Sequence, residues 1–328
     1  VIGGSALYSQ VLGGGSSAVA PHYLVSPLDG IRRRAGSEIE VRYAPGCFIH
    51  KGLPAPDVET LSTSTGESSL ALEFFDNIDL AGPPAYHLTS KRVQFGWFDQ
   101  SVPAVSQERF SVRLSGNFVP KVSGRHTFGL NLVGWGRLYI DEEKVIDTWG
   151  LEDPNGQRTI QMDMQAHQEY ALRIEYKWDG DIKWRMLALG HLPPYADDLL
   201  GEAVGLAKEA DVVVIVAGLT GEWESEGFDR PDMLLPGEQN ELIRKIAEAN
   251  PKTVVVLNAG SPVEMPWLGE IPAVLQMWYD SQEQGNALAD ILFGDVSPSG
   301  KLPITFPRKL QDNPSFINFP GENGEVHY

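Results

Sequence analysis

The strongest constraint on the fold is a series of continuous apolar runs in the second half of the chain, separated by segments with helical periodicity. Residues 211–217, 253–257 and 273–278 are rich in Val, Ile and Leu and lack polar alternation. Strands of this kind are buried on both faces, as in a parallel sheet covered by helices. We therefore predict an αβα sandwich from about residue 199 onward. The intervening helices are expected at residues 200–210, from residue 236 onward with Leu242, Ile243, Ile246 and Ala247 on one face, and at residues 284–293 with Gly294 as a cap.

The middle of the chain has a different pattern, in which short segments alternate apolar and polar residues. Turn signals separate them, such as Pro-Asn-Gly at residues 154–156. Short alternating strands at this spacing predict an antiparallel sandwich or barrel. The predicted strands are residues 110–118, 124–132, 137–140 and 170–176.

The start of the chain resembles its end, with glycine-rich turns over residues 3–41 and a predicted strand near residues 38–43. The simplest architecture is one α/β domain interrupted by an inserted β domain. A Ser/Thr-rich run near residues 59–69 is interpreted as the entry linker, and Pro193-Pro194 marks the exit. The predicted domains are residues 1–64 and 194–328 for the α/β part and residues 65–193 for the insert.

Composition limits the classes of partner. The 328 residues carry a net charge of -18, which argues against nucleic acid and anionic membranes and fits a neutral ligand such as a sugar. No apolar stretch approaches the roughly 18 residues of a membrane span. The single cysteine, Cys47, excludes an internal disulfide and is interpreted as a small buried residue. The histidines show no metal-ligand spacing, so no metal and no cofactor is predicted; homo-oligomerisation stays open.

An acidic loop, residues 222–231, directly follows the apolar run at residues 212–217. Loops at the carboxyl ends of parallel strands commonly carry the chemistry of α/β proteins. Neighbouring carboxylates would raise each other's pKa, as a proton donor in glycosidic cleavage requires. Glu226 is the preferred candidate, with Glu222 and Glu224 as alternatives. The local sequence by itself is also compatible with a solvated acidic loop.

Three motifs, in order, carry a resemblance to glycoside hydrolase family 3. Ser-Glu-Gly-Phe-Asp-Arg at residues 225–230 resembles the acid/base loop of that family. Asn-Ala-Gly-Ser-Pro-Val-Glu-Met-Pro-Trp at residues 258–267 is similar to another family segment, and the run at residues 294–307, which contains Gly-Lys-Leu-Pro-Ile-Thr-Phe-Pro, is the most specific. The middle region resembles a protective-antigen-type β domain through residues 118–128 and 137–141.

The resemblance implies part of a retaining β-glucosidase that hydrolyses terminal β-D-glucosyl residues of short glucosides such as cellobiose. Glu226 would be the general acid/base, and an N-terminal barrel of the same polypeptide would supply an Asp nucleophile. No segment resembling that barrel is found, Val1 is not a Met, and the family usually continues beyond Tyr328, so we expect a fragment that is inactive alone. β-Xylosidase or N-acetylglucosaminidase specificity stays open, because the barrel carries most of the sugar-selecting subsite.

The inserted domain offers a second candidate site. In the resembling subgroup the insert limits substrate length, so Trp135, in the Gly-Trp-Gly loop at residues 134–136, is a candidate for the aglycone subsite if its ring is exposed. Packing in the core or at an edge is the alternative. The rival function is a non-catalytic carbohydrate-binding module. Lectin members of the insert family bind calcium through adjacent aspartates before the strand that matches residues 137–140, and residues 133–136 (Val-Gly-Trp-Gly) have none.

Two further features have structural interpretations. Gly-Gly-Gly-Ser at residues 13–16 lacks the Gly-Lys-Ser/Thr ending of a phosphate loop and is interpreted as a tight turn. Asp229 and Arg230 are expected to form an internal ion pair that shapes the acidic loop.

Overall fold

The computed structural model divides the chain into two compact units. One comprises Val1–Lys51 and Ala196–Tyr328, and the other Gly52–Tyr195. The residues that the structure describes are 1–7, 10–17, 19, 21–97, 104–106, 108–180, 184–194, 198–226, 228–319, 321–323 and 325.

The entry into the β unit lies after Lys51, earlier than the predicted boundary at residue 64. Strand β1 (Leu61–Ser62) pairs antiparallel with the end of β5 (Arg109–Phe118), and Leu61 is buried in the β core. The Ser/Thr-rich composition wrongly suggested a linker here, because Ser and Thr hydroxyls can bond to nearby backbone groups within a folded segment. For example, Thr60 Oγ1 donates to the Asp57 carbonyl at 2.6 Å.

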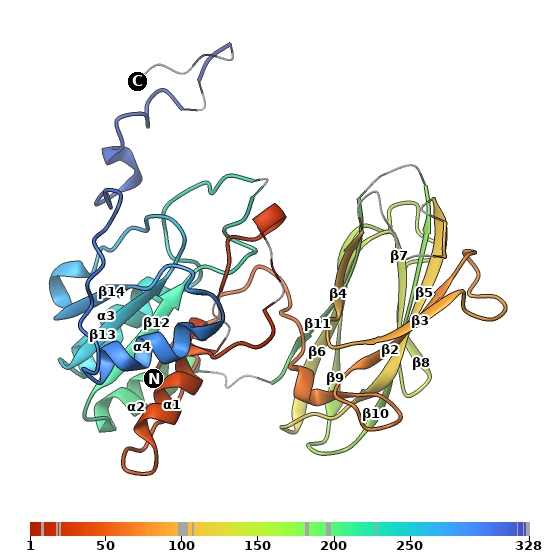
Figure 1. Cartoon of the computed structure of the whole chain (residues 1–328), viewed down its shortest axis with the longest axis horizontal. Coiled ribbons are helices and arrows are strands. Elements are labelled where there is room, and N and C mark those ends of the chain that lie inside the picture. The colour runs from red at the N-terminus through yellow and green to blue at the C-terminus, as the bar shows by residue number, and fades with distance from the viewer. Residues whose placement is uncertain are drawn as a thin grey trace. The chain divides into compact units, whose positions relative to one another are not determined.

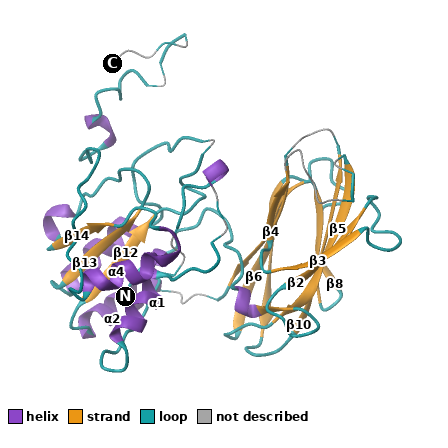
Figure 2. Cartoon of the chain, in the orientation of Figure 1, coloured by secondary structure: helices purple, strands orange, loops and turns teal. Residues whose placement is uncertain are grey.

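The α/β unit contains a parallel sheet with the order β12 (Val213–Gly218), β13 (Thr253–Asn258) and β14 (Ala273–Gln276). On the other side of β12, Ile2 forms parallel bridges to both Ile215 and Ala44. Figures 1 and 2 show helices packed against this sheet. The helices are α1 (Pro27–Ala35), α2 (Leu199–Glu209), α3 (Gln239–Ala249) and α4 (Gln284–Leu292).

Successive strand residues enter two different cores because their side chains alternate between the faces of the sheet. Ile215 packs in the core that includes residues of α2 and α3, whereas Val216 packs with Leu28 of α1 and Leu288 of α4. The prediction of a parallel sheet with helices on both faces is therefore confirmed.

Two local predictions in this unit were wrong. Helix α3 begins at Gln239 rather than at Pro236, because Gly237 has a φ of +65°, which lies outside the right-handed helical region. The Gln239 side chain is buried at the helix start. It accepts from the Gly218 N–H at 2.8 Å and donates to the Gly218 carbonyl at 2.9 Å, which ties the helix start to β12. The strand expected near residues 38–43 does not form. Residues 36–40 are exposed, and Ala44 contributes only the single bridge to Ile2.

The β unit is a sandwich of two antiparallel sheets. One has the order β3-β2-β5-β10-β7-β8 with β1 also paired to β5, and the other has the order β4-β11-β6-β9. Their inner faces enclose one continuous core. The predicted antiparallel sandwich is confirmed, but several strands were missed. The strands not yet given are β2 (Leu70–Phe75), β3 (Tyr86–Ser90), β4 (Gln94–Trp97), β6 (Gly124–Val133), β7 (Trp135–Ile140), β8 (Glu143–Asp147), β9 (Gly156–Met164), β10 (Tyr170–Asp179) and β11 (Arg185–Leu192).

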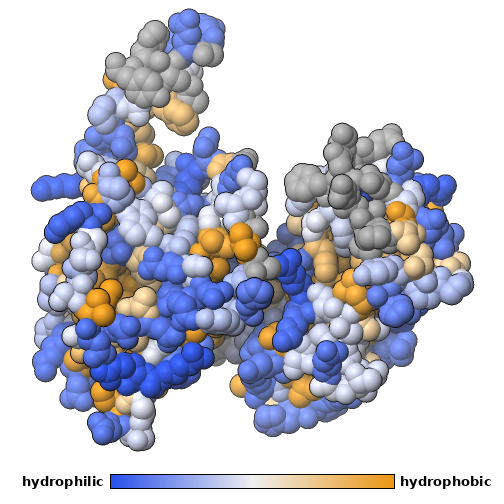
Figure 3. Space-filling model, viewed as in Figure 1, coloured by the Kyte–Doolittle hydropathy of each residue, from blue (hydrophilic) through white to orange (hydrophobic). Residues whose placement is uncertain are grey.

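The face of the molecule drawn in Figure 3 is largely hydrophilic. On this face, hydrophobic side chains form small separate groups among hydrophilic ones. No helix among the described residues is both long and apolar enough to span a bilayer. Cys47 is buried, as predicted, and burial raises the pKa of its thiol to about 12, which does not favour a reactive thiolate.

Two histidines form a buried stacked pair in the β core. His126 Nε2 lies 2.9 Å from the Val122 carbonyl, so this nitrogen carries the proton and Nδ1 accepts from His191 Nε2 at 2.9 Å. Burial, with the neighbouring His126 as a smaller cause, lowers the pKa of His191 to about 3. His126 is thus a packing residue of the β core.

We expect this pair to make folding sensitive to acid. Because the folded pKa of His191 lies below the ordinary value of about 6.5, its contribution is complete above pH 6.5. It is lost as the pH falls from about 6.5 toward 3, by about 1.4 kcal/mol per pH unit for one proton. His191→Gln keeps an N–H donor opposite His126 but does not titrate. Urea unfolding between about pH 7 and 4.5 should therefore show a shallower pH dependence in this variant.

The matched control is His87→Gln, which replaces an exposed histidine of the same unit. Its pH dependence should equal that of the native chain. Equal slopes for native chain and His191→Gln would contradict the prediction.

Candidate functional site

The parallel strands bring four loops together at their carboxyl ends. The loops are residues 3–16 after Ile2, residues 219–235 after β12, residues 259–264 after β13 and residues 277–282 after β14. We call these four loops the rim. Parallel strands have their carboxyl ends at the same edge, which explains why segments far apart in sequence meet there.

The buried side chain of Asn258 connects three of these loops. It lies at the end of β13, where its Nδ2 donates to the Trp278 carbonyl at 2.7 Å and to the Gln10 carbonyl at 2.9 Å. Its Oδ1 accepts from the Gln10 N–H at 2.7 Å. A buried amide with three satisfied groups fixes the loops relative to one another.

The three glutamates of the acidic loop have different surroundings. Glu222 Oε2 lies 3.0 Å from His50 Nδ1 and accepts from Thr220 Oγ1 at 3.1 Å. The His50 side chain is only 10% exposed, so this pair is held within the α/β unit. Glu222 is therefore engaged in a local structural contact.

Glu224 is the centre of a second polar network. It accepts from the Gly260 N–H at 2.8 Å, and also from the Ser261 and Tyr279 hydroxyls. Burial and the adjacent Glu224 carboxylate both raise the pKa of Tyr279. Arg230 Nη1 donates to Ser261 Oγ at 2.9 Å, which extends the network back into the acidic loop. These contacts join three rim loops through one carboxylate.

Glu226 differs from both neighbours because it is exposed. Its Oε2 accepts from the Ser16 N–H at 2.5 Å. Hydrogen bonding from Ser16 holds the pKa of Glu226 below its ordinary value. The expectation that crowded carboxylates raise this pKa was wrong for this chain, because the exposed Glu226 carboxylate is stabilised by hydrogen bonds from Ser16. Gly227, the next motif residue, lies outside the described residues.

The expected ion pair between Asp229 and Arg230 is absent from the described part of the chain. Arg230 donates instead to Ser261 Oγ and to the carbonyls of Pro262 at 3.2 Å and Leu234 at 3.4 Å. The guanidinium therefore shapes the acidic loop by joining it to the loop after β13.

Aromatic side chains surround the base of the acidic loop. Trp223 Nε1 donates to the Ile49 carbonyl at 2.6 Å. Lys51 Nζ lies 4.5 Å from the centre of the Trp223 ring and 5.5 Å from that of Phe228. Such cation-π contacts hold the aromatic residues near the exposed Glu226. Sequence reasoning missed Lys51 and His50, which lie outside the rim, and Ser16 and Tyr279 within it, because no local motif marks these residues.

Trp135 lies in the β unit, on the outer face of the larger sheet. It begins strand β7 rather than lying in a loop, and it is half-buried, with Nε1 donating to the Leu151 carbonyl at 3.1 Å. Lys177 Nζ lies 5.6 Å from its ring centre and 4.8 Å from that of Trp149. Trp135 is therefore less exposed than predicted, and part of its ring remains accessible.

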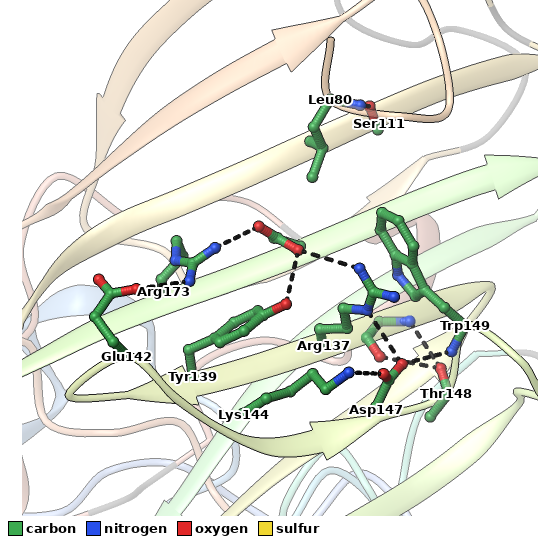
Figure 4. A network of polar contacts seen from close by, with 12 residues as sticks. Leu80, Ser111, Arg137, Tyr139, Glu142, Lys144, Asp147, Thr148, Trp149 and Arg173 are labelled. Atoms are coloured by element: carbon green, nitrogen blue, oxygen red, sulfur yellow. Dashed lines mark hydrogen bonds and ion pairs between the residues drawn. The ribbon is translucent and has the colours of Figure 1, made fainter.

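A network of charges covers the same face, as Figure 4 shows. Arg137 lies 3.7 Å from the Trp149 ring centre and pairs with Asp147 at 3.2 Å. The Tyr139 hydroxyl donates to Glu175, which also pairs with Arg173. Residues 133–136 contain no carboxylate, and no cluster of His, Cys, Asp and Glu in the described ranges could hold a metal ion.

Comparison with known proteins gives one consistent result. The sequence profile described as "Glycosyl hydrolase family 3 C-terminal domain" matches residues 1–328. A "Beta-glucosidase" from Rhizobium radiobacter is 39% identical over 345 residues, covering 100% of this chain and 41% of the relative. "Probable beta-glucosidase I" from Emericella nidulans is 36% identical over 353 residues, with the same coverages.

A crystal structure titled as β-glucosidase from Kluyveromyces marxianus in complex with glucose is also similar. It superposes with a TM-score of 0.89 at 35% identity, covering 99% of this chain and 41% of the other. The chain thus spans about two fifths of the length of the relatives it matches.

The Glu224 network yields a stability prediction. Tyr279→Phe removes one of the donors to a partly buried carboxylate, so we expect a loss of about 1–3 kcal/mol in the free energy of unfolding, measured with urea. Tyr23→Phe is the matched control, since the Tyr23 hydroxyl also donates to a glutamate, Glu283, but its ring is 52% exposed. This control should change stability little, and equal effects of the two variants would contradict the assigned role of Tyr279.

Proposed function

The chain belongs to glycosyl hydrolase family 3 and matches the C-terminal domain of that family over its whole length, and on this premise we propose that it is part of a retaining β-glucosidase. The substrates are short glucosides with a terminal β-D-glucosyl residue. Glu226 acts as the general acid/base. The observation that carries this assignment is the exposed Glu226 carboxylate in the rim, beside two glutamates that are bound to other donors.

The mechanism requires a second carboxyl group. In retaining glycosidases the two groups lie about 5–5.5 Å apart. A part of the longer polypeptide outside this chain supplies the nucleophilic Asp, which attacks the anomeric carbon while Glu226 gives its proton to the departing oxygen. Glu226 then takes a proton from water, which attacks the same carbon and releases the Asp and β-glucose.

The partners of the glutamates favour Glu226 over its neighbours. Glu224 accepts hydrogen bonds from three groups, and Glu222 is held by His50 and Thr220. Proton transfer at either carboxylate would break these contacts. In the part of the chain that the structure describes, the hydrogen-bond donors to Glu226 all belong to Ser16, and the carboxylate is exposed, so it is available for proton transfer.

The low pKa of Glu226 in this chain suits only one of the two steps. The carboxylate form is the base that activates water, whereas the first step needs the protonated acid. In the complete enzyme, a second carboxylate and a substrate that excludes water would both raise this pKa. The pKa required for the first step therefore comes from outside this chain.

Trp135 is proposed to contact the part of the substrate beyond the terminal glucose, and so to influence which substrate lengths are accepted. Its partly accessible ring, beside Lys177 and near Trp149, offers an apolar face on which the second sugar or an aryl aglycone can stack. Selection for glucose rather than xylose or N-acetylglucosamine depends on residues outside this chain, so a panel of aryl glycosides of the three sugars decides between these specificities.

We expect Glu226→Ala, made in the longer enzyme, to separate substrates by leaving group. The value of kcat/KM should fall by about 10²–10⁴-fold for a glucoside with a poor leaving group, which needs a proton donor. For 2,4-dinitrophenyl glucoside, which does not need one, it should change little. Azide should rescue turnover and form β-glucosyl azide, because it replaces water without needing a base.

Asp229→Asn is the control, since it removes a neighbouring carboxylate of the same loop. It should leave the leaving-group dependence unchanged. Equal losses on both substrates for Glu226→Ala would remove Glu226 from this role. Turnover by the isolated chain would contradict the need for an external nucleophile, and micromolar calcium-dependent sugar binding by it would favour a carbohydrate-binding module.

For Trp135→Ala we expect a loss confined to longer substrates. Loss of one stacking face should lower kcat/KM for cellobiose or aryl glucosides about 3–10-fold. The value for methyl β-glucoside should not change. Trp184→Ala, at a more exposed tryptophan of the β unit, is the matched control. If cellobiose and methyl glucoside are affected equally, Trp135 is not an aglycone residue.

A further inference from the structure

The glycine turn, residues 13–16, lies directly against the acidic loop although more than 200 residues separate them in sequence. Gly14 and Gly15 have φ angles of +77° and +58°, which most residues with a Cβ adopt only with strain. The Ser17 N–H and hydroxyl both bond to the Gly14 carbonyl, at 3.2 and 2.6 Å, and close the turn.

The contact leaves no room for side chains in the turn. A Cβ on Gly15 would lie 2.4 Å from Glu226 Cβ and 2.6 Å from Glu226 Oε2, and one on Gly14 would lie 2.7 Å from Ser225 Oγ. By contrast, a Cβ on Gly13 would meet only Ser17 Oγ, at 3.3 Å. Two of the three glycines are therefore required by the acidic loop as well as by the backbone.

The residues just before the turn are hydrogen-bonded to other loops of the rim. The Ser281 N–H donates to the Val11 carbonyl at 3.2 Å, and Gln10 is bound by Asn258. At the other end, the Ser16 N–H is the donor to Glu226 Oε2. The position of this amide thus depends on the same contacts that hold the sheet edge together.

We propose that the glycine turn is a positioning element for Glu226, in which the Ser16 amide holds Oε2 and the bare Gly14 and Gly15 let the two loops meet. A main-chain N–H can donate but cannot accept a proton, so the Ser16 amide stabilises the carboxylate form of Glu226 at Oε2. The orientation of Glu226 is a property of this chain, whereas its consequence for catalysis rests on the proposed function.

The first experiment tests the contact without activity. Glutamate labelled with ¹³C at Cδ is titrated in the native chain and in Gly15→Ala, with Glu226→Gln to assign the signal. Because the hydrogen bonds from the Ser16 hydroxyl and amide favour the carboxylate, their loss in Gly15→Ala should raise the Glu226 midpoint. Gly13→Ala should leave the midpoint unchanged.

Backbone strain needs its own control. Gly14→Ala places a Cβ at a similar positive φ but against Ser225, so it should lower stability without moving the Glu226 midpoint. If Gly15→Ala does not fold, Gly15→Asn is the second variant, since Asn tolerates this backbone conformation while keeping the overlapping Cβ. The same Glu226 midpoint in native chain, Gly15→Ala and Gly15→Asn would overturn the proposal.

The second experiment uses the longer enzyme. Displacement of the acid/base should lower kcat/KM for poor leaving groups about 10–100-fold in Gly15→Ala but not in Gly13→Ala. It should also shift the alkaline limb of the pH profile upward. If Glu226→Ala lacks the leaving-group effect, the proposed function fails while the titration result stands. If Glu226→Ala shows the leaving-group effect but Gly15→Ala does not, the positioning role is contradicted and the proposed function is retained.

Discussion

The parallel ladder between β12 and β13 is the constraint on which the candidate site depends. Its register joins Val213 to Thr253 at one end and Gly218 to Asn258 at the other, so both strands end at the same level. The approach is close at this end, where a Cβ on Gly218 would lie 2.1 Å from the Asn258 carbonyl oxygen. Asn258 can then bind Gln10 and Trp278 together. Without this register, the four loops of the rim would not meet.

Within the rim, hydrogen-bond donors decide what each glutamate can do. Three similar side chains lie within five residues of sequence, yet Glu222 contacts His50, whereas Glu224 accepts from Tyr279 and from other groups of the rim. Neither of these two glutamates contributes to the pKa shift of the third, whose causes are the hydrogen bonds from Ser16 and, in the opposite direction, desolvation. Glu226 is hydrogen-bonded by Ser16 and remains exposed. The difference among them is one of partners and burial rather than of residue type.

The β unit is stabilised by its own core, separate from those of the α/β unit. Its two sheets bury a common core. The buried histidines fit in this core because both ring nitrogens of His126 are hydrogen-bonded, one to His191 and the other to the Val122 carbonyl. The outer face of the larger sheet carries paired charges and two half-exposed tryptophans, Trp135 and Trp149. The alternation of strand residues thus separates a core that stabilises the unit from a face that can contact a ligand.

The sequence alone determined the class of both units, because buried parallel strands and half-buried antiparallel strands leave different periodicities. It also marked the acidic loop and, through family motifs, Glu226. It could not indicate that residues 52–64 join the β unit, since that depends on the pairing of Leu61 with Phe118. Nor could it give the low pKa of Glu226 or the partners Ser16 and Tyr279. These contacts join segments distant in sequence, and only the tertiary structure decides which donors each carboxylate meets.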